Sequence, residues 1–166
     1  DDTDGCDRYC DLAGADPASS KACPGTEVNL WGTDVVYDGS TAALVGQGNC
    51  SIDKACPGTS GNQATNGAAE PERIFHVTAH KTGTLSVQTT NVDFDNFLYA
   101  ADHCTLDPPS PIDPYLKCAN GAAGIGPETL IMAVDAGKSY TIVVDGSGIV
   151  LDAPDRGNFR VTFSLY

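Results

Sequence analysis

The sequence predicts an all-β fold: a jelly-roll-like sandwich of two antiparallel β-sheets, held by disulfides and containing little helix. Three observations support this prediction. Eighteen glycines and ten prolines among the 166 residues are typical of a chain with many turns and short strands. Short segments rich in β-branched and aromatic residues recur between Gly, Pro and Asp turn residues. No helical period extends beyond about two turns, so we expect any helix to lie at the periphery.

The chain is expected to divide into an N-terminal arm and one sandwich domain. Residues 1–25 contain Leu12 as their only large aliphatic side chain, so this arm has little to bury and cysteines are expected to hold it. The sandwich spans residues 26–166, which is long enough to form a hydrophobic core. Within it, residues 46–71 contain five glycines and no aromatic residue, which predicts a long surface loop.

Nine segments are expected to form strands. They are residues 26–31, 34–37, 41–45, 73–79, 83–90, 95–101, 128–134, 139–145 and 158–166. The last of them alternates between apolar and polar residues, which predicts one buried face and one solvated face. Residues 130–134 and 141–144 are instead apolar at both parities, which predicts central strands covered on both faces.

The charge of the chain excludes one class of partner. The formal net charge is -13 at pH 7, from 22 acidic and nine basic residues, and it repels the phosphate backbone of nucleic acids. The same charge attracts cations, so calcium and basic partners remain open.

No segment has the 18 or so consecutive apolar residues of a membrane span, and the polar start at Asp1 does not match a signal peptide. We expect a mature, secreted protein, located outside the cell or at its surface.

The seven cysteines predict disulfides rather than a redox centre or a zinc site, because none has the C-x-x-C spacing. The expected pairs are Cys104 with Cys118, Cys50 with Cys56, and Cys10 with Cys23. Cys6 is left single by these pairs, which predicts a free thiol or a bridge to another chain. Pairing of Cys6 with Cys10 or Cys23 remains open, and it would change only which cysteine is left over.

Two acidic clusters are candidates for calcium, which takes about six to eight oxygen ligands. They are Asp2, Asp4 and Asp7 in the arm, and Asp93, Asp95 and Asn96 at the start of a strand. A disordered acidic terminus is the competing interpretation of the first cluster, where the position of Gly5 does not fit an EF-hand loop. Turn capping by Asx side chains competes with calcium at the second. Asn49 lies in an N-x-S pattern and is a candidate for glycosylation.

The sequence contains no recognisable catalytic constellation, so we expect no enzymatic activity. There are three histidines and no nucleophile elbow. His76 and His80 lie four residues apart on an expected strand, about 13 Å, which is too far for two ligands of one metal ion. Both are therefore interpreted as surface histidines, and His103 as incidental.

Five segments in order resemble the bacterial pre-peptidase C-terminal (PPC) domain. They are GTLSV at 83–87, DFDNFLY at 93–99, the cysteine-bounded loop 104–118, AGKSYTIVVDG at 136–146, and GNFRVTFSL at 157–165. The resemblance extends over residues 26–166. It implies a secreted, non-catalytic, jelly-roll-like sandwich, usually appended to extracellular enzymes or surface proteins and related to collagen-binding modules that hold calcium. The arm and the glycine-rich loop depart from the pattern of the family.

Two functions are expected from these observations. The first is a structural or adhesive protein that self-assembles into a cell-surface fibre or layer as a homo-oligomer, through strand pairing by residues 26–31 or 158–166. The alternative is a calcium-assisted module that binds carbohydrate or matrix. Carbohydrate sites often expose aromatic platforms, and Trp31, Tyr37 and Tyr115 are the main candidates.

Overall fold

Nine strands and no helix make up the regular structure of the computed structural model, which describes residues 25–41, 72–102, 117–121, 124–146 and 156–166. The strands are β1 (Thr26–Leu30), β2 (Val35–Ser40), β3 (Arg73–Ala79), β4 (Gly83–Thr90), β5 (Asn96–Ala101), β6 (Lys117–Ala119), β7 (Thr129–Val134), β8 (Ser139–Gly146) and β9 (Asn158–Leu165). The described residues include no helix long and apolar enough to cross a membrane. Most of the arm, the glycine-rich loop and the strand expected at 41–45 lie outside the described residues.

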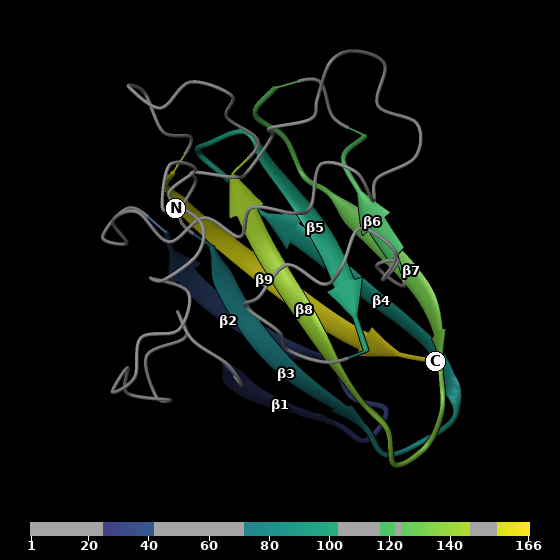
Figure 1. Ribbon diagram of the computed structural model, residues 1–166. Helices are drawn as coiled ribbons and strands as arrows, with labels where there is room; N and C mark the ends of the chain where they lie inside the picture. The colour runs from purple at the N-terminus through teal and green to yellow at the C-terminus, as the bar shows by residue number, and fades with distance from the viewer. Residues whose placement is uncertain (1–24, 42–71, 103–116, 122–123, 147–155) are drawn as a thin grey trace, which may run out of the picture.

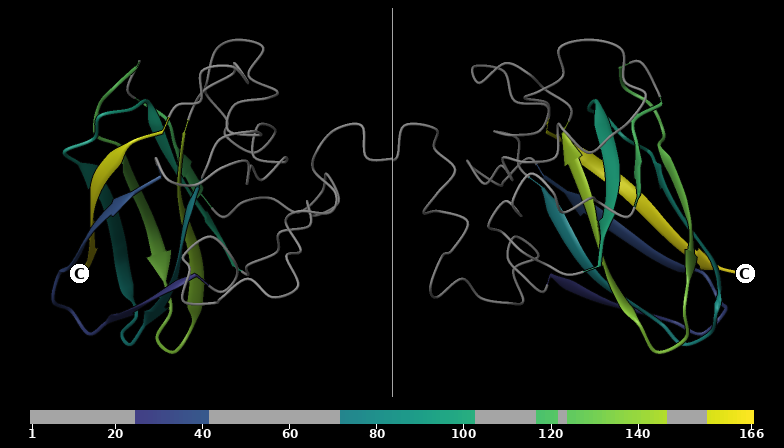
Figure 2. Two further views of the ribbon diagram at one scale, coloured as in Figure 1. Left: turned by 90° about the vertical axis from the view of Figure 1, so that its left-hand side faces the viewer. Right: turned by 45° about the vertical axis from the view of Figure 1, so that its right-hand side comes forward.

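The strands form two sheets that pack face to face (Figures 1 and 2). One has the order β1-β3-β8-β5-β6 and the other the order β2-β9-β4-β7. The all-β sandwich predicted from the sequence is therefore confirmed, and the fold is the one that the resemblance to PPC domains implies.

The prediction of two wholly antiparallel sheets is wrong at one pair. β1 runs parallel to β3, with Thr26 opposite Phe75 and Leu30 opposite Ala79. Parallel neighbours need a long connection. Here the connection passes through β2 in the other sheet before the chain returns at β3. The periodicity of apolar residues in the sequence does not indicate whether neighbouring strands run parallel or antiparallel.

The main core lies between the two sheets. Along β9 the alternation predicted from the sequence is confirmed as far as Phe163, with Phe159, Val161 and Phe163 buried on the inner face, whereas Ser164, predicted on the solvated face, is also buried. Phe75 of β3 meets this strand from the other sheet, with its ring centroid 5.1 Å from that of Phe163. Tyr37 and Phe75 form a T-shaped pair at the same centroid separation of 5.1 Å. These aromatic contacts hold the two layers together by burying apolar area.

β8 is buried on both faces, as its apolar sequence predicts. Its inward side chains join the main core, whereas Val143 faces outward. There Val143 belongs to a second apolar cluster with Ile74, Phe97 and Tyr99. The sheet that contains β8 is thus apolar on both sides of its centre.

The same prediction fails for residues 130–134. β7 is the edge strand of the four-stranded sheet, and its burial alternates, with Leu130 and Val134 buried and Ile131 53% exposed. Apolar residues at both parities therefore do not indicate a central strand here. In β7 they occur in an edge strand that exposes an apolar residue.

β6 was not expected, because Lys-Cys-Ala has no strand periodicity. It pairs with β5, which places Cys118 opposite Tyr99. Cys118 is disulfide-bonded, and its partner lies outside the described residues, so the pairing with Cys104 stays a prediction. The other expected pairs and the single Cys6 also lie outside them.

Candidate functional site

Trp31 forms the most prominent exposed aromatic feature near the sheet that begins with β1. It follows the last residue of β1 and is 62% exposed. The indole lies parallel to the imidazole of His80, with ring centroids 3.7 Å apart and an interplanar angle of 3°. Since His80 covers one face of the indole, the exposed part of Trp31 includes the opposite face.

The parallel pairing of β1 with β3 creates this stack. Leu30 lies opposite Ala79, so the next residue of each strand, Trp31 and His80, leave the sheet side by side. The backbone N–H of His80 donates to the carbonyl of Leu30 at 2.9 Å, which continues the pairing by one residue. The two rings are therefore placed by the register of the sheet.

A side-chain hydrogen bond fixes the orientation of the imidazole. Nε2 of His80 lies 2.9 Å from Oδ1 of Asn29. An amide oxygen only accepts, so Nε2 carries the proton and donates in this contact. Three side chains are thus held together, and we call Trp31, His80 and Asn29 the Trp31 platform.

The turn after Trp31 brings a cation close to the platform. Gly32 has a φ of 103°, a conformation that favours glycine. A Cβ at Gly32 would lie only 2.8 Å from Nζ of Lys81, so the lysine ammonium approaches the backbone next to Trp31 through the space that the glycine leaves. Lys81 adds a hydrogen-bond donor beside the platform.

Polar side chains continue from the platform across the outer face of the sheet. Glu27 of β1 is exposed and lies opposite His76 of β3, and Asn29 lies opposite Thr78. Oγ1 of Thr78 is in turn 2.9 Å from Oγ of Ser139 on β8. The platform therefore has hydrogen-bonding groups along one side.

The other aromatic candidates are placed differently. Tyr37 is half-buried, and its ring packs against Phe75 in the core, so it does not form an exposed platform. Tyr115 lies outside the described residues. Among the expected platforms, the structure describes Trp31 alone as exposed. The partnership of Trp31 with His80 was missed, because it depends on the parallel register.

The contacts of Asp93 and Asn96 support the capping interpretation of the second acidic cluster. The carboxylate of Asp93 accepts hydrogen bonds from the backbone and side-chain N–H groups of Asn158. Oδ1 of Asn96 accepts from Oγ1 of Thr89 at 2.9 Å, and Nδ2 donates to the carbonyl of Gly126 at 2.7 Å. These groups hold strand ends together.

Asp95 differs from its neighbours in the same cluster. Its Oδ1 is buried and has no hydrogen-bond partner among the described residues. Within those residues, no three His, Cys, Asp or Glu side chains are grouped so that they could hold a metal ion. Calcium at Asp93, Asp95 and Asn96 stays a prediction. The other candidates, Asp2, Asp4, Asp7 and Asn49, lie outside the part of the chain that the structure describes.

A buried polar network joins the two sheets near β5 and β7. Thr89 of β4 donates to Asn96 of β5, and its Oγ1 also accepts the backbone N–H of Glu128 at 2.9 Å. Glu128 is 3% exposed, and both of its carboxylate oxygens lie within 3.0 Å of the backbone N–H of Gly121. Within this network, the hydroxyl of Thr89 therefore links the two sheets.

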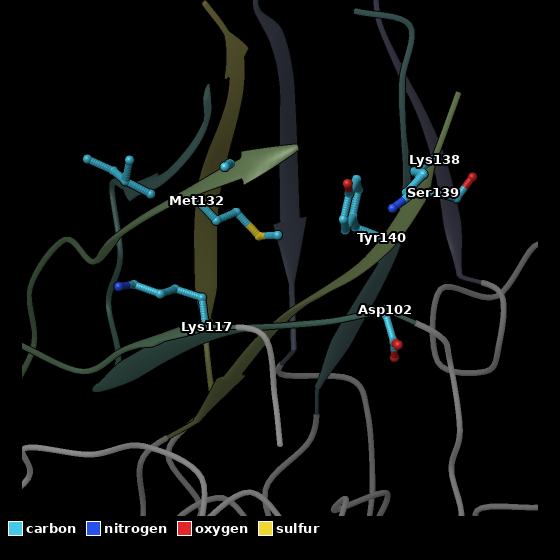
Figure 3. A pocket seen from close by; sticks show the side chains of 8 residues that line it. Asp102, Lys117, Met132, Lys138, Ser139 and Tyr140 are labelled. Atoms are coloured by element: carbon cyan, nitrogen blue, oxygen red, sulfur yellow. The ribbon is translucent and has the colours of Figure 1, made fainter. Parts of the chain in front are cut away.

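A hollow opens between the edges of the two sheets at β6 and β7 (Figure 3). Met132 and Tyr140 point into it, and Lys117, Lys138 and Asp102 lie around it. Lys138 forms an ion pair of 2.9 Å with Asp135, and this hydrogen bond raises the pKa of Lys138. Among the described residues that line the hollow, none is a histidine or a cysteine.

Comparisons with known proteins find similar solved structures but no matching sequence. No family model and no curated protein sequence matches this chain. One similar solved structure is PliG of Aeromonas hydrophila, a periplasmic inhibitor of g-type lysozyme, with a TM-score of 0.49 and 10% identity over 85% of this chain and 96% of that one. Another is the pre-peptidase C-terminal domain of a Bacillus anthracis collagenase, with a TM-score of 0.45 and 10% identity over 85% and 93%. That domain belongs to the family that the sequence resembles. We transfer no residue role or ligand from either protein.

Proposed function

We propose that the chain is a non-catalytic extracellular module that binds a neutral carbohydrate through the Trp31 platform. The observation that supports this proposal is the stacking of His80 on one face of an indole that is 62% exposed. An exposed tryptophan is ordinarily free to rotate, and ordering it on binding costs conformational entropy. Here the stack and the hydrogen bond from His80 to Asn29 hold the ring in place before a ligand arrives.

The chemistry of the platform matches that of a sugar ring. A pyranose has an apolar face of C–H groups and a rim of hydroxyls. The free face of Trp31 offers an apolar surface of the same shape, and aromatic rings of this kind supply large contact areas with few rotatable bonds. Asn29 and Lys81 lie beside it and offer an amide and an ammonium to the hydroxyls.

The charge of the chain selects among glycans. A formal charge of -13 repels sulfated and uronic polysaccharides over the range of a Debye length. Glu27, which is exposed on the same face of β1 as Asn29, adds a local negative charge. A neutral glycan escapes this repulsion, so it is the class that fits best.

Replacing Trp31 with alanine is expected to weaken binding about thirtyfold or more, because truncating a central tryptophan typically costs about 2 kcal/mol or more. The measurement begins with an array of neutral, acidic and sulfated glycans, with and without a calcium chelator. Calorimetric titration of the neutral hits then compares the parent with Trp31→Ala. The chelator arm tests whether calcium takes part.

Tyr166 provides the matched control, since it is an aromatic residue with 79% exposure that does not belong to the platform. We expect Tyr166→Ala to bind as the parent does. Equal affinity of Trp31→Ala and the parent for the same glycan would reject the platform, and a parent that binds no glycan would reject the function.

A second candidate function is self-assembly into a surface fibre or layer, as a structural or adhesive subunit. One observation favours it: β7 ends the four-stranded sheet with exposed Ile131 and no charged residue. Such an edge is open to strand addition. Electron microscopy of the native protein is expected to show fibres or ordered layers. A single species at the monomer mass, unchanged at high concentration in light scattering, would contradict this candidate.

A further inference from the structure

We propose that β7 pairs antiparallel with β7 of a second copy about a twofold axis at Ile131, which joins the two four-stranded sheets into one. This inference rests on the second candidate function and names the partner and the register of one of its contacts. A twofold pair is closed, so this contact alone gives a dimer, and a fibre or layer needs a second interface. The pairing is inferred from a difference between the sheet edges. Edge strands present unpaired backbone groups, and proteins protect them with charges, short strands, Pro or bulges.

Three of the four edges that the structure describes have such protection. β1 carries the exposed Glu27. β2 carries Asp38, which is bound by Arg160 through contacts of 2.6 and 2.8 Å. β6 is only three residues long and begins with Lys117. β7, with the sequence TLIMAV, has six residues and neither charge, Gly nor Pro.

The backbone N–H and C=O groups of the odd-numbered residues of β7 point to its free side. The N–H of Thr89 donates to the carbonyl of Glu128, so even-numbered residues of this strand direct their backbone groups towards β4. The N–H and C=O groups of Thr129, Ile131 and Ala133 therefore point to the free edge. Three alternate residues have a centre, and that centre is Ile131.

Because these groups are arranged symmetrically about Ile131, the edge of β7 can pair with the same edge of a second copy. When Ile131 lies opposite Ile131 of the second copy, Thr129 lies opposite Ala133 of that copy, and each of these pairs exchanges two hydrogen bonds. The exposed Ile131 side chains then cover each other across the axis. The flanking residues Thr129 and Ala133 are small, so their own side chains do not obstruct the pairing.

The electrostatic surroundings permit the approach. Two copies of a chain with a formal charge of -13 repel each other in general. Around β7, however, Lys117 and Lys138 offset Asp102 and Asp135, the latter through an ion pair of 2.9 Å with Lys138. With the buried Glu128 just before β7, two lysines stand against three carboxylates among the described residues, so this edge is far less acidic than the chain as a whole and repels a second copy only weakly.

The first test changes one residue on each edge of the same sheet. Ile131 and Val36 are both 53% exposed, on β7 and β2 respectively. In light scattering at high concentration, we expect the parent and Val36→Lys to have twice the 17.2 kDa of a single chain, or to form larger assemblies. We expect Ile131→Lys to be a monomer with an unchanged circular dichroism spectrum, because like charges would lie directly opposite each other.

The second test fixes the register by cross-linking. Opposite residues of a hydrogen-bonded pair have Cα atoms about 5.5 Å apart, within the range of a disulfide. Ile131→Cys is therefore expected to form a dimer on oxidation, with a linked peptide that mass spectrometry identifies. Ala133→Cys is expected not to cross-link, because the two copies of residue 133 lie about 13 Å apart. The parent chain, oxidised in parallel, accounts for the cysteines already present.

The outcomes separate the register from self-assembly itself. A parent that stays monomeric at high concentration overturns both. Assembly that survives Ile131→Lys but is lost in Val36→Lys keeps self-assembly and overturns pairing through β7. A cross-link at residue 133 in place of residue 131 overturns the twofold axis at Ile131.

Discussion

Replacing Phe75 with alanine is expected to lower the free energy of unfolding by about 3–5 kcal/mol, the usual cost of removing a buried phenylalanine. Phe75 has no exposed surface and lies in the layer between the sheets. Its ring contacts Tyr37 of β2 and Phe163 of β9, both in the opposite sheet. Neither ring can fill the space alone, so the substitution leaves a cavity between the layers. Urea unfolding under non-reducing conditions measures the effect.

Phe75→Leu is the matched control, since it keeps most of the apolar volume and should cost less than the alanine variant. A loss below about 1 kcal/mol for Phe75→Ala would mean that the sheets collapse onto the cavity and that this contact does not hold them together.

Replacing Thr89 with valine is expected to cost about 2–6 kcal/mol, although the side chain keeps its shape. The hydroxyl of Thr89 donates to Asn96 and accepts from the backbone N–H of Glu128. Thr89 is fully buried, and valine would leave both partners without this hydrogen bond. Each buried polar group left unsatisfied costs about 1–3 kcal/mol.

Thr89→Ser separates the hydrogen bonds from the packing, because serine keeps the hydroxyl and loses a methyl group. We expect the serine variant to be the more stable of the two in urea unfolding. The reverse order would show that the methyl group matters more than the network between the sheets.

Periodicity predicted most of the strands, because a strand that is buried on one face has apolar residues at alternate positions. β3 and β4 have the predicted bounds, and the alternation of β9 is confirmed as far as Phe163. Periodicity could not predict strand direction or neighbours. The parallel pair of β1 and β3 and the edge position of β7 both depend on contacts between residues distant in sequence.

The candidate site could be predicted only in part for the same reason. Trp31 was identifiable as a large aromatic residue after a short strand. His80 was interpreted as a surface histidine, because no pattern in the sequence around it indicates a contact with Trp31. The two rings lie 49 residues apart along the chain, and only the register of β1 on β3 brings them together.

The parallel register has a consequence for how the molecule opens. β1 is an edge strand, joined to the sheet through β3 alone, and strands attached on one side tend to detach at lower free energy than the core. The Trp31 platform exists only while β1 is docked, since His80 and Asn29 come from β3's end and from β1. Whatever binds Trp31 therefore binds the docked state alone, and by linkage it holds β1 against the sheet. Detachment of this one strand would release the ligand while the rest of the sandwich stays folded.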